Sequence, residues 1–173
     1  MSLKTIKTLF ITGMTIVIIA SVLEVFFIQD SWNLLFYMSM VGHVIFAVGL
    51  WLMDKIASSP LCRYYIAMMA IGCSLHYLQS YEINALVVMI LALFLLFLVF
   101  KYLDIFTKVS GEHLFINSFY CFIICSIIGF CILKFSNIVE YSSTRTFIIG
   151  FMIFPAFIVY IAAILNLRSI NSL

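Results

Sequence analysis

The sequence predicts an all-α membrane protein: one domain (residues 1–173) forming a bundle of six transmembrane helices, with both termini on the inner side of the membrane. Its residues are 66% hydrophobic and 9% charged, whereas a soluble domain is usually about 45–50% apolar and about 25% charged. The apolar residues form long unbroken runs, which favours helices because the strands of a membrane barrel would alternate. The charges fall mainly between these runs.

The six apolar runs approach the about 20 residues that cross the hydrocarbon core of a bilayer. The first run follows Lys4 and Lys7, and it is longer than the apolar core of a signal peptide, so we expect it to be retained. The third run is the shortest and contains His76 and Gln79. The predicted spans are residues 8–28, 34–53, 64–81, 84–103, 114–133 and 146–166.

The positive charges give the orientation. With six spans and an inner N-terminus, the inner side carries Lys4, Lys7, Lys55, Arg63, Lys101, Lys108 and Arg168. The outer side then carries Lys134 and Arg145. Because positive side chains gather on the inner side, this division favours six spans over an alternative in which the third run is re-entrant and the division is more even. Trp32 and Trp51 would lie at opposite interfaces.

Two ionisable residues, Glu24 and His76, lie inside apolar runs at a similar depth in the predicted outer leaflet. Gly13 and Gly72 lie on the small-residue faces that lead to them, and such faces pack against neighbouring helices. We therefore expect both side chains to point into the bundle. A carboxylate in hydrocarbon needs a partner, so the pair predicts a binding site, with Gln79 beside it. The alternatives are a hydrogen-bonded strut or a glutamate that reaches the headgroups.

His43 lies near the middle of the second span and is a further candidate binding residue. A haem held by two histidines needs them at similar depths, but His43 and His76 differ by roughly 7 Å along the helix axis. Haem b therefore stays an alternative, and we predict no cofactor. The cysteines lack C-x-x-C spacing, and we predict no metal site.

Two features of the last spans are also candidates. Asn117, Cys121, Cys125 and Gly129 recur at four-residue spacing, which predicts either a packing seam or the polar lining of a pathway. For this reason Asn117 is a candidate binding residue. Pro155 removes a backbone hydrogen bond in the middle of the sixth span and is expected to kink it, so it is a candidate hinge.

Three function classes remain open from the sequence. The first is a permease, channel or ligand-binding membrane component that uses the polar site of Glu24 and His76. The second is a non-catalytic accessory or immunity-type protein that contacts another membrane protein or a copy of itself. The third is an intramembrane enzyme with unidentified catalytic residues, which the lack of HExxH, GxSxG and P-loop motifs disfavours.

The predicted partners and location follow from the same features. The lipid bilayer is the expected partner, because most of the chain is apolar. No basic block is present, so no nucleic-acid partner is expected. The topology favours a plasma membrane or a bacterial inner membrane.

Overall fold

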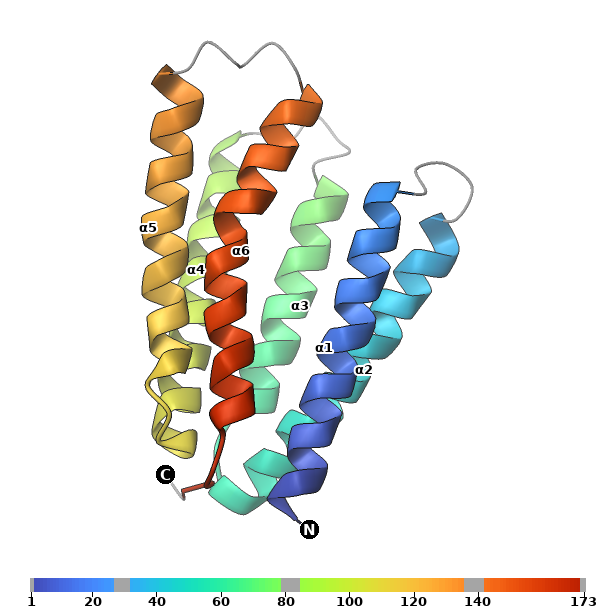
Figure 1. Cartoon of the computed structure of the whole chain (residues 1–173), viewed down its shortest axis with the longest axis vertical. Helices are drawn as coiled ribbons and strands as arrows, with labels where there is room; N and C mark the ends of the chain where they lie inside the picture. The colour runs from blue at the N-terminus through green and yellow to red at the C-terminus, as the bar shows by residue number, and fades with distance from the viewer. Residues whose placement is uncertain (1, 27–31, 79–84, 136–141, 172–173) are drawn as a thin grey trace.

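The computed structural model describes residues 2–26, 32–78, 85–135 and 142–171. These residues form six helices, as the sequence predicts (Figure 1). The helices run alternately up and down, so Ser2 and Asn171, the first and last described residues, lie at one end of the bundle, here called the terminus end; the opposite end is the distal end (Figure 1). The helices are α1 (Leu3–Phe26), α2 (Trp32–Ala57), α3 (Leu61–Leu78), α4 (Ala85–Ser110), α5 (Leu114–Phe135) and α6 (Ser142–Asn166).

Within the described residues, four helices are long and apolar enough to cross a membrane. Their qualifying stretches are Leu3–Ser21, Leu34–Ala57, Leu86–Ser110 and Leu114–Ile132. The apolar stretches of α3 and α6 are shorter, at Leu61–Leu75 and Phe154–Asn166. Large apolar side chains such as Phe94, Ile127 and Phe130 are exposed on the outside of the bundle. Exposed apolar surface of this kind suits contact with lipid rather than water.

Several helices extend beyond the apolar runs from which they were predicted. For example, α4 continues to Ser110, seven residues past the predicted end at 103. An apolar run marks only the part of a helix that suits hydrocarbon, whereas the backbone hydrogen bonds continue into the polar region. There, Lys108 pairs with Asp104 one turn earlier, at 2.8 Å. Gly111 then ends α4 with a φ of +69° and donates its N–H to the Thr107 carbonyl at 2.8 Å.

Glycines bring α1 and α2 into close contact. A Cβ on Gly13 would lie 2.7 Å from the Gly42 carbonyl oxygen, and one on Gly42 would lie 2.7 Å from the Gly13 oxygen. Both clashes are with backbone, so only glycine permits this approach. The close packing expected of the small-residue face holds here, whereas on α3 no described atom lies within 4 Å of a Cβ built on Gly72.

Most of the buried core lies toward the terminus end. The ring of Phe106 stacks on Phe115, with centroids 4.0 Å apart, and meets Phe10 edge-on at 5.7 Å. In the distal half, buried apolar side chains are few among those described, and include Ala20 and Leu35. The core cluster comprises Ile6, Phe10, Phe46, Leu50, Met53, Ala57, Leu61, Tyr102, Leu103, Phe106, Val109, Phe115, Ala163, Ile164 and Leu167.

Hydrogen bonds also join the elements at the terminus end. The Asp54 carboxylate accepts the N–H groups of Leu61 at 2.9 Å and Cys62 at 2.8 Å, so the end of α2 caps the beginning of α3. Lys7 of α1 donates to the carbonyl of Leu165 near the end of α6. The Asn171 N–H donates to the Val109 carbonyl of α4 at 2.7 Å. The first turns of α1, the segment after α6 and the α2–α3 turn are therefore held to neighbouring helices.

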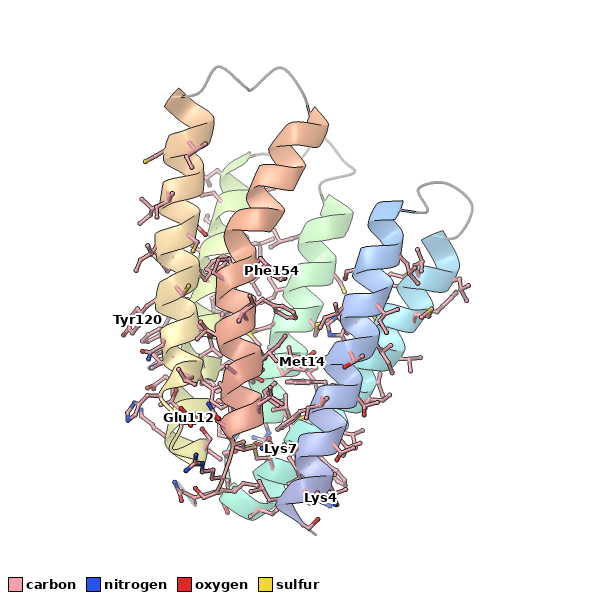
Figure 2. The ribbon with its side chains drawn as sticks, viewed as in Figure 1. Lys4, Lys7, Met14, Glu112, Tyr120 and Phe154 are labelled. Atoms are coloured by element: carbon pink, nitrogen blue, oxygen red, sulfur yellow. The ribbon has the colours of Figure 1, made fainter. Side chains whose placement is uncertain are left out.

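The terminus end also carries most of the positive residues. Lys4 and Lys7 begin α1, and Figure 2 shows both near this end. The others on this side are Lys55, Arg63, Lys101, Lys108 and Arg168. Lys134 and Arg145 lie on the distal parts of α5 and α6. The seven-to-two division of lysine and arginine residues thus corresponds to the two ends of the folded bundle.

Candidate functional site

A cavity of about 350 Å³ lies at the centre of the bundle, and all six helices contribute to its wall. α1, α3 and α5 run away from the terminus end, whereas α2, α4 and α6 run back toward it. These directions place Tyr65, Ser118 and Tyr160 on the side of the cavity nearer the core, here called the floor. Met68 and Phe122 lie one turn farther toward the distal end. The cavity therefore adjoins the packed core, and Phe46, Tyr102 and Leu103 belong to both.

Aromatic and aliphatic side chains form most of the cavity wall. Phe46, Phe119, Phe122 and Phe157 line it together with aliphatic groups from α1 and α4. Figure 2 shows Met14, one of these groups, on the side of α1 that faces the other helices. None of the described residues that line the cavity carries a formal charge at neutral pH if His43 is neutral. The cavity is thus suited to an uncharged, mostly apolar molecule.

The polar groups of the cavity occur as two hydrogen-bonded pairs. His43 Nδ1 lies 2.7 Å from the Tyr65 hydroxyl, which joins α2 to α3. The Tyr102 and Tyr160 hydroxyls lie 2.9 Å apart and join α4 to α6. The rings of Tyr65 and Tyr102 are neighbours, with centroids 6.1 Å apart. The two pairs therefore lie next to each other, and together they involve four helices.

The hydroxyl of Ser118, the remaining polar side chain on the wall, is already used within its own helix. It donates to the Phe115 carbonyl at 2.6 Å. A serine so bonded has no neighbouring base to activate it as a nucleophile, because the lining residues place histidine only at position 43, on α2. The polar chemistry of the cavity consequently rests on the imidazole and the three tyrosines.

Three residues of the predicted polar site cannot be located by their side chains. Glu24 lies on the last turn of α1 and His76 near the end of α3, but their side chains fall outside those described. Gln79 lies outside the described residues altogether. The predicted contact between Glu24 and His76 therefore stays a prediction. Both helices do run toward the distal end, as that prediction assumes.

The other predicted residues occupy different positions relative to the cavity. His43 lines it. Asn117 has an exposed side chain at the beginning of α5, and its neighbour Ser118 lines the cavity instead. α6 continues as a helix through Pro155, which is exposed, whereas the next residue, Ala156, is buried on the cavity wall. The hinge assigned to Pro155 stays a prediction.

The sequence did not identify Tyr65, Tyr102 and Tyr160 as candidate site residues. Tyrosine is common at membrane interfaces, so a tyrosine near the end of an apolar run gives no specific signal. These tyrosines form a site only because the packing of α3, α4 and α6 brings them to the same depth in the bundle. The sequence does not show that packing.

The described residues include no group of three or more histidine, cysteine or acidic side chains able to hold a metal ion. The Sγ atoms of Cys121 and Cys125 are 4.0 Å apart on successive turns of α5. The Nδ1 atom of His43 already bonds to Tyr65.

No protein-family model, curated protein or solved structure matches this chain.

Proposed function

We propose that this chain is a small integral membrane protein whose central cavity binds an apolar small molecule. The observation that carries the proposal is the cavity of about 350 Å³, which lies within the range of known ligand pockets, about 300–1,000 Å³. Each of the six helices contributes to its wall. A ligand there would contact the whole bundle, so its binding would affect the packing of every helix.

All six helices are proposed to cross the membrane, with the terminus end on the inner side. The 18 residues of α3 span about 27 Å, close to the thickness of the hydrocarbon core. The positive residues at the terminus end support this orientation through the positive-inside rule. A plasma membrane or a bacterial inner membrane fits this topology.

Ligand binding is preferred over the other function classes for physical reasons. A hydrated ion or polar solute would lose its water against these apolar walls, which disfavours a channel or a permease for such solutes. An accessory protein that acts only through its surface would have no need of a central cavity. An intramembrane enzyme is disfavoured because the described residues of the cavity wall include no activated nucleophile. His43 and Tyr65 form a hydrogen-bonded pair of the kind that acts as acid and base. The Ser118 hydroxyl, the best candidate nucleophile among the lining residues, is instead bonded to a carbonyl of its own helix.

Saturable photolabelling would test this proposal. The full-length protein in lipid nanodiscs would be exposed to a 12-carbon alkyl diazirine, illuminated and digested, and the labelled residues identified by mass spectrometry. We expect saturable labelling at Met68, Phe119 and Phe122, which line the cavity. Labelling of outer faces should rise in proportion to probe concentration, because those faces contact bulk lipid.

Two valine variants of α4 provide a matched control. Val99 lines the cavity, so Val99→Phe should fill part of it and reduce the saturable labelling. Val87 is exposed on the outside of the same helix, and Val87→Phe should leave the labelling unchanged. Labelling that never saturates in the unsubstituted protein, or an equal response of the two variants, would contradict the proposed function.

A further inference from the structure

We infer that the ligand is a neutral lipid from the surrounding bilayer, with a hydroxyl or carbonyl head that accepts a hydrogen bond from the pair of Tyr102 and Tyr160. This inference rests on the proposed function and adds the chemical class and orientation of the ligand. Its head would lie on the floor of the cavity, and its chain would extend toward the distal end.

The hydroxyl protons of Tyr102 and Tyr160 favour a ligand that carries a hydrogen-bond acceptor. Each hydroxyl carries one proton, and the single bond between Tyr102 and Tyr160 uses one of the two. One hydroxyl proton therefore remains available to a third group. Both tyrosines line the cavity, so a ligand oxygen there is in a position to accept it. A ketone oxygen would serve as well as an alcohol, because the pair has a donor to offer.

The pair of His43 and Tyr65 also has one polar proton that is not used within the pair. With a neutral imidazole, His43 and Tyr65 carry two polar protons and share one hydrogen bond. The remaining proton belongs to either the imidazole Nε2 or the tyrosine hydroxyl, depending on the tautomer. Tyr65 contacts the core ring of Phe46, but Tyr102 is itself only 3% exposed and contacts Phe106, and Tyr160 contacts Phe115. We therefore assign the head of the ligand to the pair of Tyr102 and Tyr160, which lies against the fully buried rings.

The absence of charge from the described cavity wall determines the charge of the ligand. A carboxylate or an ammonium head would need a counter-charge in this apolar environment. The described lysines and aspartates lie outside the lining residues, among them Asp54 and Lys101. A neutral head loses less hydration energy on entry than a charged one and recovers part of that loss through one hydrogen bond.

The head-group preference can be measured by competition against the 12-carbon alkyl diazirine in nanodiscs. The competitors share a 12-carbon chain and differ in the head: dodecane, 1-dodecanol, 2-dodecanone, dodecanoate and dodecyltrimethylammonium, compared at equal mole fraction in the bilayer. We expect the alcohol and the ketone to displace the probe at about threefold lower mole fraction than dodecane, as expected for one hydrogen bond inside a membrane protein. Both charged competitors should be weaker than the alcohol.

A double substitution tests the role of the tyrosine pair. Tyr102→Phe combined with Tyr160→Phe keeps both rings and removes both hydroxyls, so neither hydroxyl is left without a partner. We expect the advantage of dodecanol over dodecane to disappear. Tyr37 and Tyr120 are 65% and 52% exposed, and Figure 2 shows Tyr120 on the outer side of α5. Tyr37→Phe with Tyr120→Phe is the matched control and should keep that advantage.

The outcomes separate this inference from the proposed function. Saturable labelling that dodecane or a charged competitor displaces as well as dodecanol would overturn the inference while the cavity remains a binding site. An unchanged dodecanol advantage in the Tyr102 and Tyr160 double variant would do the same. Failure of the diazirine to label the cavity saturably would instead overturn the proposed function, and the inference with it.

Discussion

At the terminus end, the rings of Phe10, Phe106 and Phe115 are fully buried against one another, whereas about one helical turn farther along, the same six helices surround a cavity. If the bundle crosses a membrane, as proposed, water provides no drive to fill its interior, because lipid outside the helices is as apolar as the core inside. Filling depends on the shapes of side chains and on hydrogen bonds. The terminus end has both, in interlocked aromatic rings and in caps that connect neighbouring helices.

Among the described side chains, the cavity half has fewer such restraints. Its polar groups bond in pairs that join α2 to α3 and α4 to α6. In Figure 1, α1 and α5 lie farther apart toward the distal end than at the terminus end. The packed terminus end, here called the base, lies next to the proposed ligand site. Substitutions in the base, and at Gly13 where α1 and α2 are in close contact, should affect stability, whereas the other substitutions on the cavity wall should affect binding.

The largest loss of stability is expected from Phe106→Ala. A buried phenylalanine replaced by alanine costs about 3–5 kcal/mol in a soluble core, and the unfilled space left behind is costly in a membrane protein too. The free energy of unfolding, measured by SDS titration in mixed micelles, should fall most in this variant. Phe94 is exposed on the same helix, so Phe94→Ala is the control and should change little. Equal losses would mean that the base is not packed as described.

The next largest effect is expected at the contact between α1 and α2. Gly13→Ala would place a Cβ against the Gly42 carbonyl and the Phe46 backbone N, and overpacking of this kind costs about 1–3 kcal/mol. Gly72→Ala adds the same methyl group where no described atom lies within 4 Å. The unfolding free energies of the two variants should therefore differ. A Gly13 variant as stable as the Gly72 variant would show that the close helix contact does not form.

A smaller effect is expected where α2 caps α3. Asp54→Ala removes the acceptor for the N–H groups of Leu61 and Cys62, and loss of such a cap costs about 0.5–2 kcal/mol. Asp104 instead forms an exposed pair with Lys108, which contributes about 0.3–0.5 kcal/mol. The free energy of unfolding, measured by SDS titration, should be lower for Asp54→Ala than for Asp104→Ala. The reverse order would exclude the cap as a structural restraint.

Among the substitutions in the core and on the cavity wall, the smallest effect on stability is expected from the Tyr102→Phe and Tyr160→Phe double variant. Removing both members of a hydrogen-bonded pair leaves neither one unpaired, and a side-chain hydrogen bond within a membrane bundle contributes about 0.6 kcal/mol. The melting temperature of the ligand-free protein should therefore stay close to that of the unsubstituted protein. A large fall would assign the pair to the packed base and not to the ligand site.

The number and order of the helices could be predicted from the apolar runs because lipid imposes long unbroken stretches. The helix ends could not, as α4 shows: its polar last turns carry Asp104 and Lys108 beyond the apolar run. His43 was identified because a histidine is unusual in an apolar run. The tyrosines were missed because their significance depends on which helices meet at that depth.

The orientation of side chains around each helix was the least predictable property. α5 is apolar around most of its circumference, so the sequence gives no clear inner face. Asn117 was singled out for its polarity, yet Ser118, the next residue, lines the cavity. On α1, in contrast, Gly13 marked the contact face correctly, because a close approach of two backbones requires a small residue.

The ligand site would be seen in an experimental structure of the protein in lipid nanodiscs, determined once with 1-dodecanol and once without it. We expect a packed terminus end in both structures. With the alcohol we expect elongated density in the cavity, with an oxygen about 3 Å from the hydroxyl of Tyr102 or Tyr160. A bundle in which Met68 and Phe122 fill the centre in both structures, leaving no space for the alcohol, would contradict the proposed ligand site.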